Sequence, residues 1–195
     1  MSLFYRPALS AGLFLWSILF ITPGVTTVHA QDNGSVIQTR VALSTEGGMV
    51  PAGETIQAAI IATLAPGFHV NAHKPTQKWL IPTELIIEGM KDVAIDSTLY
   101  PQPMEKALEF SDGAKLALYE ETFTIGLIIR TKKTLAPGKY TLKGVLGYQA
   151  CNDQMCMAPD EIPVAITFSA GKAGQPVRKT NQTIFYNDPS TRKKQ

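Results

Sequence analysis

The stretch TFTIGLIIRTKKTLAPGKYTLKGVLGY, residues 122–148, decides the fold class of this chain. It contains two runs, 122–130 and 138–148, that are rich in β-branched and aromatic residues and have period-two character. Such runs are typical of β-strands with one face in a core. Ala136-Pro137-Gly138 stands between them, and it is typical of a turn because Pro presets φ and Gly accepts a positive φ. The stretch therefore predicts two strands joined by a turn.

Runs of the same character continue on both sides of this stretch. They cover residues 36–43, 55–64, 85–87 and 161–168, and turn-like links such as Pro51-Ala52-Gly53 and Ala65-Pro66-Gly67 separate several of them. No window longer than ten residues has a convincing helical period. Several short strands with regular turn signals predict an all-β fold, an immunoglobulin-like antiparallel β-sandwich. We expect one such domain over residues 31–169.

One long region, Tyr100 through Gly113, is predicted to lack regular structure. It holds Glu105, Glu109, Phe110 and Asp112. Loops of this length are usually functional or disordered. An ordinary crossover between the two sheets is the alternative.

Residues 1–30 are predicted to be a secretory signal. Arg6 supplies the positive charge, residues 8–21 are apolar, and Val28-His29-Ala30 is a small-x-small cleavage site. The apolar run is shorter than the ~20 residues that a spanning helix needs. We therefore expect cleavage near Ala30, export to the periplasm, and no stable membrane insertion afterwards. An uncleaved membrane anchor is the alternative.

Charge is unevenly spread along the chain. Residues 31–169 carry a net charge of −4, and residues 170–195 carry +5. The body therefore has no basic stripe of the kind that nucleic acid binding requires. The polar, basic end at residues 170–195 is predicted to be a disordered, solvated tail, although a partner-docking arm has a similar composition.

The chain has only two cysteines, Cys151 and Cys156, in the segment YQACNDQMCMAP. A disulfide that closes so short a loop adds only ~2 kcal/mol in the chain-entropy estimate, against ~3 kcal/mol for a 15-residue loop. A strand that ends near Cys151 and a returning turn can bring the two sulfurs within bonding range. The pair would then lie at a tip of the sandwich. A redox pair that opens and closes and a static bridge in an exported protein both remain open.

Cu(I) binding is a third reading of the same segment. Cys151, Met155, Cys156 and Met157 place four sulfurs within seven residues, and thiolates and thioethers select Cu(I). Hydrolase and phosphate-binding motifs are absent from the sequence. His69 alternates with apolar neighbours and is interpreted as a structural or edge residue. The redox reading requires no cofactor and no metal.

The cysteine segment and several other motifs resemble a known family, the periplasmic N-terminal domain of the thiol:disulfide interchange protein DsbD. The resemblance covers residues 35–168, and its most specific part is Tyr148-Gln149-Ala150-Cys151 followed by Cys156 and Pro159. The supporting motifs are Gly67-Phe68-His69-Val70-Asn71, Ile81-Pro82-Thr83, Tyr100-Pro101 and Leu118-Tyr119-Glu120. Together these motifs are far more specific than a lone cysteine pair.

The resemblance implies a function and a set of site residues. The domain would take electrons from a membrane electron donor and pass them to thioredoxin-like periplasmic proteins, as part of a protein-disulfide reductase. Cys156 would form the mixed disulfides and Cys151 would resolve them. Phe110 would act as a cap that shields the disulfide, and Leu108 stands where the family can carry a second acid. The remaining residues that would shape the site are Glu109, Tyr119, Tyr148 and Gln149.

Overall fold

The structure of the protein is a computed structural model, and it describes residues 35–186 without the side chain of Phe110. The predicted signal with its cleavage site at Ala30 lies outside the described residues, as do residues 187–195 of the predicted tail. Between residues 35 and 186, the structure contains no helix with the length and apolar character that a membrane crossing requires.

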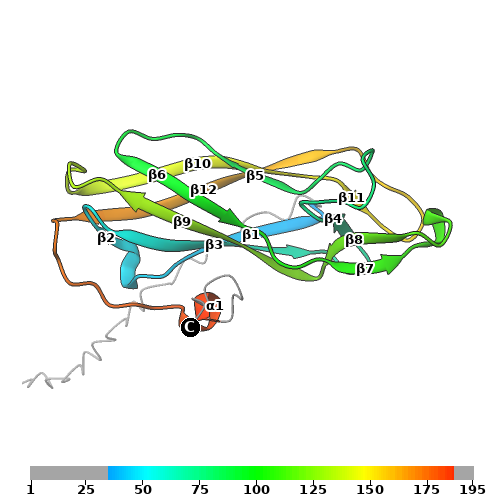
Figure 1. The fold of residues 1–195 in the computed structure, drawn as a ribbon, viewed down its shortest axis with the longest axis horizontal. Coiled ribbons are helices and arrows are strands. Elements are labelled where there is room, and N and C mark those ends of the chain that lie inside the picture. Colours follow the sequence, from blue (N-terminus) through cyan, green and yellow to red (C-terminus); the bar gives the residue numbers. More distant parts are fainter. Residues whose placement is uncertain (1–34, 187–195) are drawn as a thin grey trace, which may run out of the picture. The chain divides into compact units, whose positions relative to one another are not determined.

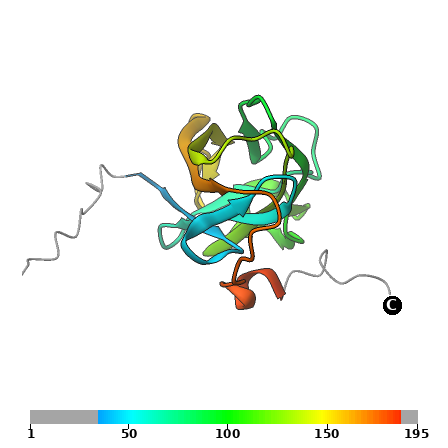
Figure 2. The same cartoon turned by 90° about the vertical axis from the view of Figure 1, so that its left-hand side faces the viewer.

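Two four-stranded sheets form the layers of a sandwich (Figures 1 and 2). The first contains, in order, β1 (Ile37–Leu43), β3 (Thr55–Leu64), β9 (Thr122–Thr131) and β6 (Val93–Leu99). The second contains β2 (Met49–Pro51), β12 (Asp160–Gly171), β10 (Gly138–Tyr148) and β5 (Glu84–Ile87). All pairs are antiparallel except β2 with β12. This arrangement confirms the predicted all-β, immunoglobulin-like sandwich.

The core forms because alternate residues of each strand point to the same side. In β9, every second residue from Phe123 to Thr131 is buried. Ile60 and Leu127 of the first sheet meet Leu142 and Ile166 of the second sheet in one apolar cluster. The period-two character that predicts the strands is therefore the pattern that fills the space between the two layers.

β3 is buried on both faces, because a C-terminal segment covers its outer side. Ala59 and Ile61 of β3 pack against Ile184 and Phe185 near the short helix α1 (Gln182–Tyr186), which lies beneath this sheet in Figure 1. The backbone of Thr180 also donates a hydrogen bond to Ser44. Residues 172–186, which their composition assigns to a solvated tail, instead contact the sandwich, because their few apolar side chains cover apolar residues of β1 and β3.

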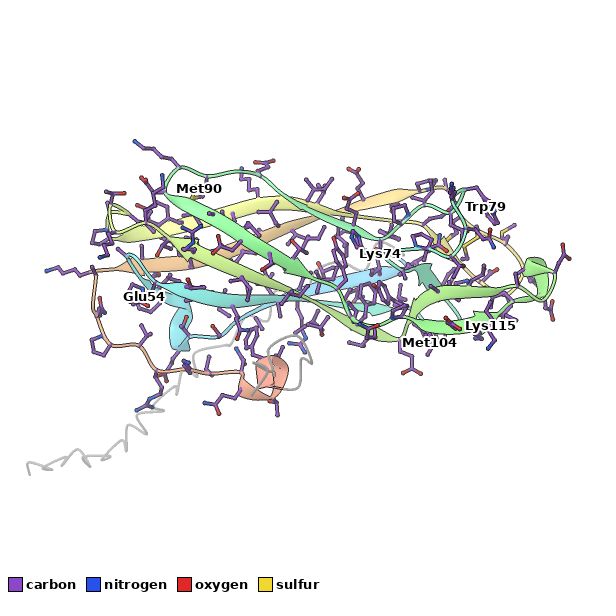
Figure 3. The ribbon with its side chains drawn as sticks, in the orientation of Figure 1. Glu54, Lys74, Trp79, Met90, Met104 and Lys115 are labelled. Carbon is purple, nitrogen blue, oxygen red and sulfur yellow. A yellow bond between two sulfur atoms is a disulfide. The ribbon has the colours of Figure 1, made fainter. Side chains whose placement is uncertain are left out.

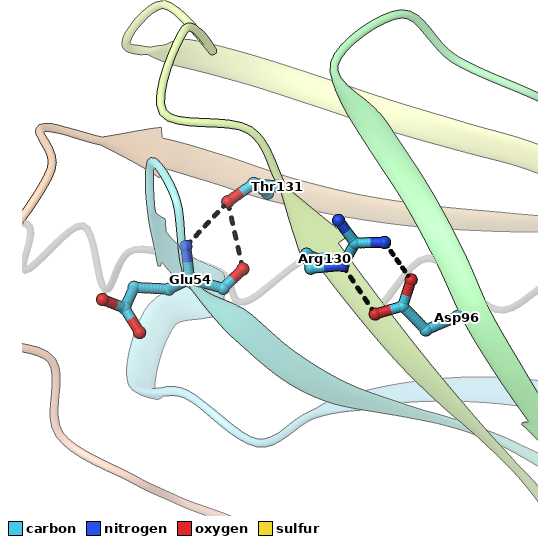
Figure 4. Close-up of polar contacts among 4 residues, drawn as sticks. All are labelled: Glu54, Asp96, Arg130 and Thr131. Carbon is cyan, nitrogen blue, oxygen red and sulfur yellow. Dashed lines mark hydrogen bonds and ion pairs between the residues drawn. The ribbon is translucent and has the colours of Figure 1, made fainter.

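A buried threonine ties the start of β3 to the end of β9 (Figure 4). The Thr131 hydroxyl accepts hydrogen bonds from the backbone N–H groups of Gly53 and Glu54, at 3.1 and 3.2 Å, and lies 3.0 Å from the carbonyl oxygen of Pro51. The neighbouring Arg130 points outward and forms a two-pronged ion pair with Asp96 of β6. Of these two consecutive residues, Thr131 therefore makes its contacts in the interior and Arg130 makes its contacts on the surface.

A third sheet of four short strands lies at one end of the sandwich (Figure 1). Its order is β11 (Ala150–Cys151), β4 (His69–Asn71), β8 (Lys115–Glu120) and β7 (Met104–Ala107). A turn of 3₁₀ helix, η2 (Glu109–Ser111), lies between β7 and β8. The prediction that residues 100–113 lack regular structure is therefore wrong for β7. That strand escapes the sequence pattern because all four of its residues are exposed and it has no apolar alternation.

Candidate functional site

The register of the third sheet places the cysteines beside a histidine. Cys151 of β11 lies directly opposite His69 of β4, and His69 lies directly opposite Glu120 of β8. Cys156 is paired with Cys151 on the other side, in an isolated antiparallel bridge. Residues directly opposite each other in antiparallel strands have their side chains on the same face. Cys156, Cys151, His69 and Glu120 therefore form one row across one face of this sheet.

Cys151 and Cys156 form a disulfide within a tight hairpin, residues 150–157. Their Cα atoms are 3.9 Å apart. The backbone N–H of Asn152 donates to the carbonyl of Met155 on one side of the pair, and that of Met157 donates to Ala150 on the other. These hydrogen bonds flank the cysteines and place the two residues opposite each other in the hairpin. The prediction that they come within bonding range is confirmed.

Side chains reinforce this hairpin at both ends. The Asn152 carboxamide oxygen accepts hydrogen bonds from the backbone N–H groups of Gln154 and Met155, at 2.9 and 2.8 Å. Asn residues commonly stabilise turns in this way. At the open end, the Gln149 side-chain amide donates to the carbonyl oxygen of Met157, at 3.1 Å. Gln149 therefore lies where it supports the cysteine hairpin.

The two cysteines differ sharply in exposure. Cys151 is 1% exposed, whereas Cys156 is exposed to solvent. Thiol–disulfide exchange requires an incoming thiolate to reach one sulfur in line with the bond. The accessible residue of the pair is therefore Cys156, and a thiolate that attacked it would release Cys151 into the interior.

Tyr119 and Tyr148 lie on the core side of this end of the molecule rather than in the cysteine row. Both belong to the main apolar cluster. Tyr119 pairs in register with Val70, so it is on the opposite face of the third sheet from Cys151, and its ring stacks on Phe123. The Tyr148 hydroxyl donates to the Asp160 carboxylate, at 3.1 Å. These tyrosines support the strands that carry the cysteines.

Burial and the adjacent Asp160 carboxylate raise the pKa of Tyr148 to about 12. The phenol in an unfolded chain titrates near pH ~10, so the neutral phenol stabilises the fold fully below that pH. As the pH rises from about 10 to about 12, this contribution is lost. We expect the free energy of unfolding of the wild type to fall over that range more than that of Tyr148→Phe, measured by denaturant titration. Parallel pH profiles for the two proteins would contradict this assignment.

The segment predicted to cap the disulfide is anchored on the same face of the third sheet as the cysteine row. Leu108, just before η2, is buried against Leu80, Leu116 and Leu118. Leu118 is in register with Asn71, which lies on the same face as His69. Glu109 is exposed. A gating role for Phe110 stays a prediction, since its side chain is not described.

Several large apolar residues are exposed at this end of the molecule. Trp79 is 69% exposed, and Figure 3 shows it at the end that carries the third sheet. Met155 and Met157, which flank Cys156, are exposed as well. Exposed apolar residues that gather at one place commonly mark protein contact sites. The thioether groups also keep the Cu(I) reading open for the reduced protein, in which the cysteines would supply thiolates.

The sequence interprets His69 as a structural or edge residue. Its exposure of 2% fits a structural residue, but it is not at an edge, because β4 lies between β11 and β8 and His69 is directly opposite Cys151. Its Nε2 atom is buried without a hydrogen-bond partner among the described residues. The signal that could have found it is a polar residue at an inward position of a short strand, but the pairing partner follows only from the tertiary register.

A cavity of about 610 Å³ lies on the other side of β8. It is lined by residues of β1, β3, β8, β9 and the α1 segment, including Arg40, Ile61, Glu120 and Phe185. Neither cysteine lines this cavity, and neither does His69. The disulfide lies in a surface hairpin instead.

No protein-family model matches the chain, and no curated protein matches it either. Among solved structures, the N-terminal domain of DsbD from Neisseria meningitidis in the reduced form aligns with a TM-score of 0.40 and 14% identity, over 73% of this chain and 90% of that chain. The N-terminal periplasmic domain of ScsB from Proteus mirabilis aligns with a TM-score of 0.48 and 13% identity, over 82% of this chain and 54% of that chain.

A family 123 glycoside hydrolase from Clostridium perfringens also aligns, with a TM-score of 0.34 and 9% identity, over 73% of this chain and 28% of that chain. Identities and TM-scores this low do not assign a function. The function is therefore argued from the disulfide, its burial and its neighbours.

Proposed function

We propose that this protein performs thiol–disulfide exchange in the periplasm through Cys151 and Cys156. It would relay reducing equivalents between a thioredoxin-like or membrane-bound donor and substrate disulfides, as a component of a protein-disulfide reductase system. The observation that carries the proposal is the disulfide of a surface hairpin in which Cys156 is exposed and Cys151 is buried. Export through a signal at residues 1–30 belongs to the same proposal.

The exchange consists of two half-reactions, reduction of this protein by the donor and its oxidation by the substrate, and each conserves atoms and electrons. A donor thiolate attacks the sulfur of Cys156, a donor–Cys156 bond forms, and Cys151 leaves as a thiolate with the electron pair. The second thiol of the donor then displaces Cys156, so the donor becomes a disulfide and this protein becomes a dithiol. Reduced Cys156 then attacks a substrate disulfide, and Cys151 displaces the substrate as a dithiol. Two electrons pass from donor to substrate.

Partner docking would take place on the surface around Cys156. Met155 and Met157 offer exposed apolar groups there, and Met side chains adapt to different partner surfaces. Trp79 is an exposed apolar group at the same end of the molecule. Glu109 and Phe110 would form the cap that a docking partner displaces, and Gln149 would hold the hairpin in shape. No metal or organic cofactor enters this chemistry.

The proposal predicts opposite behaviour for the two single-cysteine variants. Each variant is incubated with a thioredoxin-like protein that carries one active-site cysteine activated as an aromatic mixed disulfide. Cys151→Ser keeps the exposed Cys156, so we expect a covalent complex that is visible on a non-reducing gel. Cys156→Ser keeps only the buried Cys151, so we expect its complex to form at least about ten times more slowly, since a required opening of 1.4 kcal/mol already costs tenfold.

Equal rates for the two variants, or no complex with either, would contradict the proposed roles. The rival reading, an interaction module with a static bridge, is tested by the reduction potential of the wild-type disulfide. Structural disulfides typically lie below about −300 mV, whereas exchangeable ones are more oxidising. A value in the structural range, together with resistance to reduced thioredoxin-like proteins, would favour the static bridge.

A further inference from the structure

His69 is held next to the buried sulfur of the cysteine pair. It begins β4, it is paired in register with Cys151, and both residues are almost completely buried. Directly opposite side chains in an antiparallel pair have their Cβ atoms about 4.5–5.5 Å apart. An imidazole at that separation can reach the sulfur of its neighbour. Cys151 therefore lies between Cys156 on one side and His69 on the other.

The Nε2 atom of His69 has no hydrogen-bond partner among residues 35–186, although it is buried. Buried polar atoms are nearly always paired, so such an exception calls for an explanation. In the disulfide form, the Cys151 sulfur carries neither a proton nor a full negative charge. In the reduced form it becomes a thiol or a thiolate, which are the two species with which an imidazole nitrogen can exchange a proton.

The surroundings keep the imidazole of His69 neutral at neutral pH. Burial lowers the pKa of His69 below its usual value; Glu120 on β8 and Asp153 in the hairpin oppose this shift, and Lys106 on β7 adds to it. Glu120 is itself engaged by Lys106 in an ion pair of 2.9 Å. A neutral imidazole beside a thiol is the form that accepts a proton.

A buried thiol needs such an acceptor. The thiolate is the nucleophile in disulfide exchange, and an ordinary cysteine has a pKa near ~8.5, which apolar burial raises further. Cys151 is therefore expected to hold its proton at neutral pH unless a base removes it. Cys156 is exposed and meets solvent directly, so it has less need of one.

We propose that His69 is the base for Cys151 in the resolving step, which deepens the proposed function and rests on it. Nε2 takes the proton from the Cys151 sulfur, and the resulting thiolate attacks the Cys156 sulfur of a mixed disulfide. The Cys151–Cys156 bond forms, the bond from Cys156 to the substrate sulfur breaks, and the substrate thiolate leaves with the electron pair. In the reverse direction, the departing Cys151 thiolate takes the proton back from the imidazolium.

The resolving step can be isolated with a small aromatic disulfide, DTNB. The exposed Cys156 of the reduced protein releases one equivalent of coloured thiolate, and Cys151 then releases a second equivalent as it closes the disulfide. The rate of the second release is measured between about pH 5 and pH 9 for wild type, His69→Gln and the control His73→Gln. His73 is a suitable control because it stacks on Tyr100, away from the cysteine row.

We expect His69→Gln to slow the second release about 100-fold near neutral pH, the usual size of a lost general base. Below the thiol pKa, its rate should fall tenfold for each unit of pH, whereas the wild type keeps a plateau set by the imidazole. The first release should be unchanged in both variants. A second release in His69→Gln with the wild-type rate and pH profile would overturn the proposal.

A measurement on the wild type covers the case in which His69→Gln does not fold. The ring signals of His69 are titrated by NMR in the oxidised and the reduced protein. Proton exchange with Cys151 requires the His69 titration to change on reduction. Identical His69 titrations in both states would overturn the proposal. Neither experiment uses a protein partner. Each can therefore support the role of His69 even if the trapping experiment fails, and each can contradict that role even if trapping succeeds.

Discussion

Gly144→Ala is expected to destabilise the folded protein by about 3 kcal/mol, the upper end of the range for overpacked sites. Gly144 lies in the middle of β10, opposite Ile87 of β5. A Cβ atom at this position would overlap the backbone oxygen of Ile86 and would lie 3.1 Å from the Cα of Ile87. Backbone atoms cannot rotate away as a side chain can, so the two strands would have to separate.

The same strand offers a matched control. Gly147 is also paired with β5, opposite Glu84, but a Cβ atom there would lie 3.8 Å from its nearest neighbour, the backbone oxygen of Glu84. Gly147→Ala adds the same methyl group to the same strand and should change the free energy of unfolding by less than about 1 kcal/mol. Urea titration of both variants measures the contrast, and equal losses would show that the close approach at Gly144 is not the cause.

Thr131→Val is expected to cost about 2–3 kcal/mol, although the side chain keeps its shape. The Thr131 hydroxyl is buried and accepts hydrogen bonds from the backbone N–H groups of Gly53 and Glu54. Valine offers no acceptor, so the part-buried N–H of Gly53 would lose its partner, while that of Glu54 would keep only the carbonyl oxygen of Pro51 at 3.3 Å. A group that is shielded from water and left unsatisfied costs a desolvation penalty. Urea unfolding of the variant, with the midpoint and slope both fitted, gives the loss directly.

The adjacent ion pair provides the comparison for this variant. Arg130 reaches Asp96 with two contacts of 2.8 and 2.7 Å, but the pair is exposed. Exposed ion pairs are worth roughly 0.2–1 kcal/mol and weaken in salt. Arg130→Gln should therefore cost much less than Thr131→Val, and raising the salt concentration should shrink that loss. A larger loss for Arg130→Gln than for Thr131→Val would contradict the assignment of these two roles.

The long strands were predictable because each of them carries its own signal. The runs at 55–64 and 138–148 coincide with β3 and β10, and β9 and β1 differ from their predictions by a single residue. β9 alternates buried and more exposed residues along its length, whereas β3 is an apolar, β-rich run that is buried on both faces. Such a pattern is local, since one strand shows it whatever its partners are.

The short strands β4 and β7 were not predictable, because tertiary pairing creates them. β4 has three residues, all buried, and β7 has four, all exposed. Neither length nor composition distinguishes such segments from loops. They are strands because β8 lies between them and offers hydrogen bonds on both edges. Similarly, residues 172–186 have the composition of a solvated end but contact the sandwich.

The candidate site was also predictable only in part. The sequence singles out Cys151 and Cys156 as the candidate pair, and the disulfide confirms that they are within bonding range. The positions of Tyr119 and Tyr148 in the core depend on which face of a strand each residue occupies. The place of His69 beside Cys151 depends on the register between two strands that are about eighty residues apart in sequence.

By itself, the sequence determined that this protein is a β-sandwich with one pair of sulfurs that can bond, because alternation and short cysteine spacing act within a single segment. Only the tertiary structure decided that Cys156 is exposed, that Cys151 is buried, and that it lies opposite His69, whose Nε2 has no hydrogen-bond partner among residues 35–186. Burial and neighbours in space depend on the packing of distant strands, and these two properties set the reactivity of a thiol.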